Sequence, residues 1–263
     1  MLKSIKKVLS VSVLMLVLGL IAVPANAQLG RAIKNVGKAV EKTVGDVAGD
    51  MAASKVAAKI TAFMDQNNTI NEGATTKLNN IAAKYTSVDG LALNYKVYES
   101  TEANILALAD GSIRVYSAAM ELFTEDELLA LISNQIGHIA NNDVRDALLK
   151  VASEDNANDA ANAQLEKMLS FSGDKLGSVV NELIQIPYSD KQNIEADKYA
   201  FELLKKNGNE TAALHSALEK IAAMESADKA ALAENELAEL SPVSKFAKVN
   251  TGSSSRASLV ASM

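Results

Sequence analysis

Residues 127–142 read ELLALISNQIGHIANN, and this stretch organises the interpretation of the whole chain. It begins three residues after Thr124. A threonine N-cap with Glu127 at the third helical position forms a capping box, which predicts the start of a helix. The pattern predicts a central amphipathic helix that packs one face against a hydrophobic core. The apolar residues that recur with helical spacing are Leu128, Leu131, Ile132, Ile136 and Ile139.

The residues before this helix follow a different pattern. Residues 91–98 and 105–116 contain alternating and β-branched side chains, which favours strands. Asp110-Gly111 is a turn signal inside the second range, so this range predicts a hairpin. We therefore expect a small antiparallel or mixed sheet directly before the central helix.

Helical patterns cover most of the remaining chain. Ser189 and Asn209 are the expected N-caps of two later helices, and Asn207-Gly208 is the expected C-cap between them. A serine-rich tail that is irregular in part follows Ser241. The expected fold class is α+β and mostly α. The expected helices are residues 30–65, 72–85, 141–169, 189–207 and 209–224.

The first 27 residues have the pattern of a signal peptide. The run of apolar residues is shorter than the roughly 20 residues that a membrane span needs, although a retained membrane anchor is the alternative. Cleavage before Gln28 would leave a soluble periplasmic or secreted protein. The positive segment, the apolar run and the cleavage motif are Lys3, Lys6 and Lys7, residues 8–23, and Ala25-Asn26-Ala27.

Composition excludes several classes of function. The chain has no cysteine, so disulfides, thiolate zinc sites and a lipid-modified N-terminal cysteine are ruled out. The net charge is −6, and no basic stripe with interleaved aromatic residues is present. Nucleic acid is therefore not an expected partner.

Three stretches resemble, in order and separation, the HtpX and CAAX-prenyl-protease family of zinc metallopeptidases. Residues 104–115, NILALADGSIRV, are similar to the strand pair NAFALPGGxIxV, and residues 127–142 are similar to ELAAVLxHExAHxxxxH. Pro187-Tyr188-Ser189 through Asp197 is similar to PYSRxxExEAD. The resemblance implies a minigluzincin-like fold. The resulting division is a signal peptide at residues 1–27, a helical segment at 28–66, a metallopeptidase-like domain at 67–256 and a tail at 257–263.

The resemblance also assigns the residues of a zinc site. The two histidines and the general base of the family's first motif fall on Asn134, His138 and Gln135, and the third ligand falls on Asn193. A neutral amide is a poor donor to zinc, and glutamine cannot take a proton from water. Zinc is the cofactor of the family, but these substitutions imply that this chain lacks both the cofactor and the hydrolytic reaction.

Three further residues belong to the same implied site. Asp197 is retained, and we expect it to accept a hydrogen bond from His138. The family motif HPxxxxR is matched by Asn250 through Arg256, although Ser241-Pro242 is an alternative match for its first two residues. Because amides avoid the repulsion of buried carboxylates, we expect one polar cluster to form. Its expected members are Asn134, Gln135, His138 and Asn193.

The resemblance implies a peptide-binding strand beside the site. In the family this strand borders the cleft and pairs with an extended peptide, which requires only backbone groups. The expected partner is therefore an extended peptide or an envelope protein. Three functions stay open: a pseudopeptidase, a working metallopeptidase with substitute ligands, and a helical protein that binds a partner or membrane surface through residues 30–65. The strand residues are Ile113, Arg114, Val115 and Tyr116.

Overall fold

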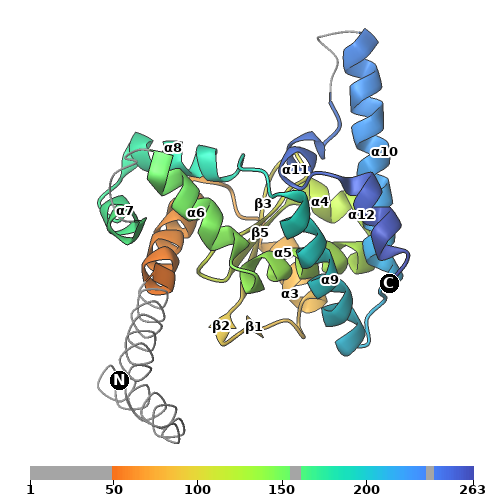
Figure 1. The fold of residues 1–263 in the computed structure, drawn as a ribbon, viewed down its shortest axis with the longest axis horizontal. Helices are drawn as coiled ribbons and strands as arrows, with labels where there is room; N and C mark the ends of the chain where they lie inside the picture. The colour runs from red at the N-terminus through yellow and green to blue at the C-terminus, as the bar shows by residue number, and fades with distance from the viewer. Residues whose placement is uncertain (1–48, 155–160, 235–239) are drawn as a thin grey trace, which may run out of the picture. The chain divides into compact units, whose positions relative to one another are not determined.

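The computed structural model describes residues 49–154, 161–234 and 240–263 (Figure 1). The expected signal peptide and residues 28–48 of the expected helical segment lie outside these residues. In the described ranges, no helix is both long enough and apolar enough to cross a membrane.

A three-stranded sheet lies directly before the central helix, as the sequence predicts. Its strands are β3 (Asn94–Tyr98), β4 (Ile105–Ala107) and β5 (Ser112–Tyr116), in the order β3-β5-β4. β5 pairs parallel with β3 and antiparallel with β4. The short strands β1 (Ser87–Val88) and β2 (Leu91–Ala92) form a separate antiparallel ribbon. The prediction of a small mixed sheet is confirmed.

The predicted turn at Asp110-Gly111 joins β4 to β5. Gly111 has φ +85°, and a Cβ atom at this position would lie 2.2 Å from the carbonyl oxygen of Ala92. Only glycine fits here, because the left-handed backbone and the close approach both exclude a side chain. The Asp110 carboxylate accepts hydrogen bonds from the backbone and the hydroxyl of Ser112 and closes the turn.

The first face of the sheet packs against the larger hydrophobic core. Tyr95, Val97, Ile105, Ile113 and Val115 alternate along the three strands and contribute to this core. The helices around it are α3 (Glu72–Ile81), α4 (Ser117–Leu122), α5 (Glu125–Ala140), α9 (Asp190–Lys206), α10 (Ala212–Glu234), α11 (Ser244–Val249) and α12 (Ser253–Val260).

The second face of the sheet packs against a separate hydrophobic cluster. Tyr98 and Leu108 contribute to it, with Leu106 and Tyr116 packed against it. We call this hydrophobic cluster the second cluster. Its helices are residues 49–67, α6 (Asp143–Glu154), α7 (Ala161–Met168) and α8 (Gly173–Leu183). Figure 1 shows the sheet between these helices and the helices of the larger core.

The helix of residues 49–67 is the described part of the expected helix 30–65. Its apolar side chains are buried in the second cluster, so this part packs on its own domain. Ala53, Val56, Ala57 and Ile60 are each 1 % exposed or less. This packing leaves residues 49–65 without an apolar face for an external partner.

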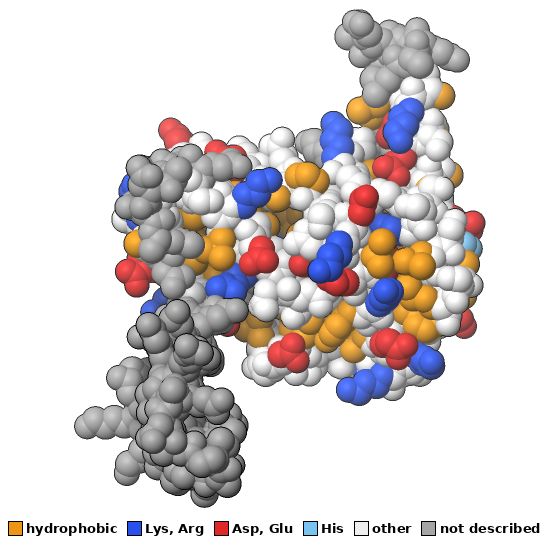
Figure 2. Space-filling model, viewed as in Figure 1, with side chains coloured by type: hydrophobic (Ala, Val, Ile, Leu, Met, Phe, Trp, Pro, Cys, Tyr) orange, Lys and Arg blue, Asp and Glu red, His pale blue; other side chains and the backbone are white. Residues whose placement is uncertain are grey.

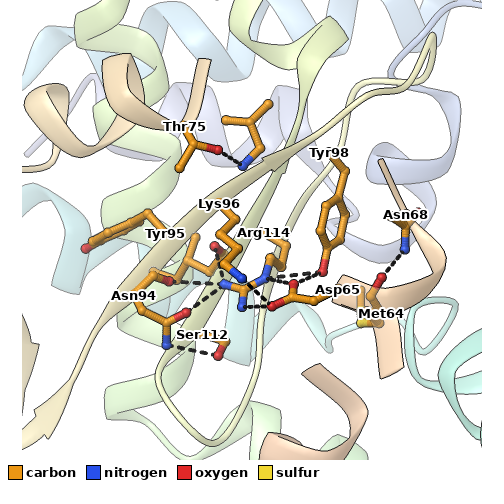
Figure 3. A network of polar contacts seen from close by, with 12 residues as sticks. Met64, Asp65, Asn68, Thr75, Asn94, Tyr95, Lys96, Tyr98, Ser112 and Arg114 are labelled. Atoms are coloured by element: carbon orange, nitrogen blue, oxygen red, sulfur yellow. Dashed lines mark hydrogen bonds and ion pairs between the residues drawn. The ribbon is translucent and has the colours of Figure 1, made fainter. Parts of the chain in front are cut away.

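A buried network ties this helix to the sheet (Figure 3). Arg114 on β5 is 1 % exposed and donates to both carboxylate oxygens of Asp65, at 2.8 and 3.1 Å. Tyr98 and Lys96 donate to the same carboxylate at 2.5 and 2.8 Å, and Asn94 accepts from Arg114 at 2.8 Å. Burial raises the pKa of Asp65, but the hydrogen bonds from Arg114, Lys96 and Tyr98 outweigh burial and lower it. Asp65 is therefore ionised at neutral pH.

The ends of α5 and α9 follow the predicted capping residues, whereas Asn209 is not the N-cap of the next helix. Thr124 and Glu127 form the capping box of α5, and Ser189 forms a second capping box with Gln192 at the start of α9. Asn207 is the C-cap of α9, followed by Gly208 with φ +67°. These ends depend on local hydrogen bonds, which explains why the sequence predicts them.

The C-terminal part differs from the sequence prediction. α10 begins at Ala212 and continues to Glu234, and the side chain of Asn209 accepts a hydrogen bond from Tyr85 at 3.0 Å. The serine-rich tail contains two helices, α11 and α12. α12 continues past Arg256 to Val260 because Ala257 and Val260 are buried against the core, a contact that local composition does not reveal.

Candidate functional site

The polar residues of the central helix lie where α5 crosses α9. Asn134, Gln135 and His138 on α5 are each 2 % exposed or less, although all three are polar. The two helices approach closely at Gly137, where a Cβ atom would lie 2.8 Å from the carbonyl oxygen of Ala196. This glycine therefore permits the crossing that brings the polar residues of both helices together.

Asp197 on α9 is the centre of the first group of contacts. Arg256 donates to its two carboxylate oxygens, each at 2.7 Å, and Asn134 donates to it at 2.8 Å. Gln135 donates to the side-chain oxygen of Asn134 at 3.1 Å. Arg256 also donates to the backbone carbonyl of Asn250 at 3.2 Å. The charge of a fully buried aspartate is thus balanced by an arginine and surrounded by amides.

His138 belongs to a second group of contacts. Its Nδ1 lies 2.8 Å from Asp143, and its ring stacks on Tyr188 with centroids 3.8 Å apart. Burial lowers the pKa of His138 more than the nearby carboxylate of Asp143 raises it. The imidazole is therefore neutral at pH 7 and donates from Nδ1, and its Nε2 is a buried acceptor that has no hydrogen-bond partner among the described residues. The hydrogen bond that we expected between His138 and Asp197 is not formed, because Asp143 occupies the only donating nitrogen.

Asn193 completes the second group. Its side-chain nitrogen donates to the backbone carbonyl of Tyr188 at 3.4 Å, and its side-chain oxygen is buried and has no partner in the part of the chain that the structure describes. The expected polar cluster is therefore split. Asn134 and Gln135 bind each other beside Asp197, whereas His138 and Asn193 bond to Asp143 and Tyr188.

A narrow cleft reaches this site from one side. Its lining includes residues 104–109 and Leu183, Ile184, Ile186 and Tyr188. Gln135 and Asn250 form the polar end, where Gln135 donates to Asn250 at 3.5 Å. The cleft thus combines apolar walls with a neutral polar end.

On the face in Figure 2, hydrophobic side chains reach the surface in patches separated by charged residues of both signs.

The structure corrects the prediction that the strand of residues 113–116 pairs with a peptide. Ile113, Arg114, Val115 and Tyr116 lie in β5, the central strand, whose two edges are already paired with β3 and β4. Both rows of backbone groups are used, so β5 cannot accept an added strand. Arg114 in addition is buried in the contact with Asp65.

The available edge belongs to β4. Tyr116 donates to the carbonyl of Asn104, and Leu108 donates to the carbonyl of Ser112, both at 2.9 Å. In an antiparallel pair these contacts alternate, so the backbone groups of Ile105 and Ala107 face away from β5. Among the described residues no strand pairs with this edge, and it lines the cleft.

Comparison with known proteins identifies the architecture. The model of peptidase family M48 matches residues 71–249. The chain belongs to peptidase family M48. Over 140 residues, this M48 chain is 36 % identical to metalloprotease LoiP of Escherichia coli (strain K12), covering 53 % of the chain and 55 % of LoiP. Over 143 residues it is 31 % identical to metalloprotease YcaL of the same organism, with the same two coverages. The chain spans about half the length of these relatives.

Membership of M48 confirms the family resemblance and the mostly helical α+β fold. The match ends at Val249, so Asn250 and Arg256 lie beyond the matched residues. The structure nevertheless brings Arg256 to Asp197, and it brings Asn250 to Arg256 and Gln135. Their place in the site therefore rests on geometry.

The residues at the implied metal position do not fit a zinc ion. No group of three histidine, cysteine, aspartate or glutamate side chains that could hold a metal occurs in the described ranges. Asn134 directs its nitrogen to Asp197 and its oxygen to Gln135, so neither atom is free. The free atoms are one imidazole nitrogen of His138 and one amide oxygen of Asn193, whereas zinc sites use imidazole, thiolate or carboxylate.

Three contributors to the site could hardly be recognised from the sequence. Asp143 and Gln192 hold His138 in place, since Gln192 donates to Asp143 at 2.9 Å. Tyr188 covers the imidazole ring. Asp143 lies five residues after His138, just beyond the end of α5, and that spacing is the one signal from which its contact could have been inferred.

Proposed function

We propose that this M48 member is an exported pseudopeptidase that binds extended peptide segments without hydrolysing them. The proposal rests mainly on one observation: the side chains at the positions of the family's first ligand and general base hydrogen-bond to each other. Asn134 and Gln135 are joined at 3.1 Å, and Asn134 is held by Asp197. Neither residue offers a carboxylate or an imidazole to a metal or to a water molecule.

The cleft beside this group retains features that suit a peptide. The outward carbonyl groups of Ile105 and Ala107 and the N–H of Ala107 offer hydrogen bonds to an added strand, a mode of recognition that does not depend on catalysis. The N–H of Ile105 already donates to the side-chain oxygen of Asn104 at 2.9 Å. The apolar walls suit aliphatic side chains, and the neutral Gln135 and Asn250 suit uncharged backbone amides. Peptide binding could therefore outlast the loss of hydrolysis.

The decisive experiment compares the mature chain with a variant whose site is restored. The variant carries Asn134→His, Gln135→Glu and Asn193→Glu. Both proteins are purified without chelator, their zinc content is measured, and zinc is titrated in a calorimeter. We expect no stoichiometric zinc in the unaltered chain and one zinc per chain in the restored variant.

A peptide assay supplies the matched control. Binding of unstructured peptides is measured for the unaltered chain and for Ala107→Pro, which removes an outward backbone donor from β4. Binding without cleavage that is lost in Ala107→Pro supports the proposal. Stoichiometric zinc and peptide cleavage by the unaltered chain, with cleavage abolished in His138→Ala, would contradict it.

One observation favours the second candidate, a working metallopeptidase with substitute ligands. His138 is oriented as metal-bound histidines usually are, with Nδ1 held by a carboxylate and Nε2 free. A metal ligand supplied from outside the described residues would be needed to complete such a site. The zinc titration distinguishes this candidate from the first.

The compartment and partner follow from the same proposal. The signal-peptide pattern of residues 1–27 supports a periplasmic or secreted location, where envelope proteins are the available source of extended segments. The metalloprotease names of LoiP and YcaL support peptides as the class of ligand, and envelope protein quality control is the role we propose. Membrane association of residues 28–48 would add to this role.

A further inference from the structure

The cleft is closed to a peptide in this structure. The side chains of Asn134, Gln135, His138 and Asn193 are each 2 % exposed or less. The free space in the cleft is about 40 Å³, which holds a few water molecules. A peptide strand beside β4 is far larger than this space. Some part of the protein that covers the cleft must therefore move before a peptide can enter.

The cover of the cleft includes a segment without regular secondary structure. It is the connection between α8 and α9, and its residues Ile184 and Ile186 line the cleft. Backbone bonds of Ile184, Gln185 and Ile186 run back only into the last turn of α8. Pro187 has no N–H group to donate. This segment is therefore held over the cleft mainly by partly buried apolar side chains.

Both ends of this segment are firmly held. On one side, α8 buries Leu176, Val179 and Val180 in the second cluster. On the other side, Tyr188 stacks on His138 and donates from its backbone to Val249 at 3.0 Å. The firm ends and the loosely held middle define a short movable segment.

We propose that residues 184–187 form a lid that opens to admit an extended peptide to the edge of β4. This inference rests on the proposed peptide-binding function, since it names the movement which that function requires. Opening withdraws Ile184 and Ile186 from the cleft, while α8 and Tyr188 keep their contacts. Such local opening needs less free energy than global unfolding, because it breaks few buried contacts.

Thiol labelling measures this opening without any ligand. The chain contains no cysteine, so a single introduced cysteine reports alone. Ala57 is 1 % exposed and lines the cleft, and it is replaced by cysteine in the mature full-length chain. Ala130→Cys in the core of α5 reports global unfolding, and Ala223→Cys at the surface reports full exposure. Each protein is first shown to be folded, and iodoacetamide labelling rates are then compared.

The lid predicts an intermediate rate at Ala57→Cys. An open population between 0.1 and 10 % corresponds to labelling roughly 10- to 1000-fold slower than at Ala223→Cys, and clearly faster than at Ala130→Cys. Adding Ile186→Ser should accelerate labelling at Ala57→Cys about 5-fold, because the lid loses apolar contact. Leu149→Ser is the matched control, since Leu149 packs against the second cluster but does not line the cleft.

Three results would overturn the lid. If Ala57→Cys is labelled at the rate of Ala130→Cys, the cleft opens only on global unfolding. If it is labelled at the rate of Ala223→Cys, the cleft is already open. Equal acceleration by Ile186→Ser and Leu149→Ser means that the whole second cluster loosens. The peptide assay is independent, so failure of peptide binding with an intermediate labelling rate contradicts the proposed function and leaves the lid intact.

Discussion

Two aspartate–arginine pairs join distant segments of this molecule, and they differ in burial and in their surroundings. Asp65 and Arg114 join the helix of residues 49–67 to the sheet, and the Asp65 side chain is 18 % exposed. Asp197 and Arg256 join α9 to α12, and Asp197 is fully buried. The first pair has additional donors in Lys96 and Tyr98, whereas the second is surrounded by amides.

The two pairs differ in how the charge of the carboxylate is compensated. At Asp65 a second cation shares the carboxylate, so the loss of one partner is partly compensated. At Asp197 the charge depends on Arg256 alone, and Asn134 supplies a neutral hydrogen bond. The substituted site therefore acts as a second structural network in the fold.

The largest expected effect is the loss of Arg256. Arg256→Met should lower the free energy of unfolding by about 3–5 kcal/mol, because a fully buried carboxylate is left without its counter-ion. Denaturant unfolding measures this loss. The paired change Asp197→Leu with Arg256→Met should recover most of it, since no charge remains. A loss below about 1 kcal/mol for Arg256→Met would remove the distinction between the two pairs.

Loss of Arg114 should cost less. Arg114→Met should lower the free energy of unfolding by about 1.5–3 kcal/mol, because hydrogen bonds to a charged group are lost while Lys96 still compensates Asp65. The same denaturant experiment applies, with Lys77→Met as the surface control, because Lys77 forms an exposed ion pair with Glu125. An effect larger than that of Arg256→Met would reverse the comparison.

A carboxylate added beside Asp197 tests why the amides are there. Gln135→Glu should lower the free energy of unfolding at pH 7 by about 1–3 kcal/mol, because burial and Asp197 both raise the pKa of the new group. A raised folded pKa makes this penalty grow above the unfolded value of about 4.3 and disappear below it. Unfolding at pH 4 and pH 7 measures the difference, and a pH-independent effect would contradict it.

The smallest effect is the pH dependence of the Asp65 network. The pKa of Asp65 is lowered below 3.8, so its stabilisation is complete above that value and is lost as the pH falls through the folded pKa. Between about pH 4 and pH 2, the unaltered chain should therefore lose stability more steeply than Asp65→Asn. Identical slopes in acid titrations of unfolding would show that Asp65 adds nothing to the pH dependence.

The sequence predicted the sheet, the central helix and its crossing partner because short-range patterns specify them. The capping boxes at Thr124 and Ser189 and the turn at Gly111 depend on residues a few positions apart. It placed α10 and α12 less well, since their ends depend on distant contacts such as the burial of Ala257.

The sequence by itself determined that Asn134, Gln135 and Asn193 carry neutral amides, and residue type decides which atoms can bind zinc. Only the tertiary structure decided their partners. It joined His138 to Asp143 and Asn134 to Asp197, and it placed β5 between two other strands. The physical reason is that pairing of buried polar groups and strand edges depends on contacts between distant residues, which local spacing does not specify.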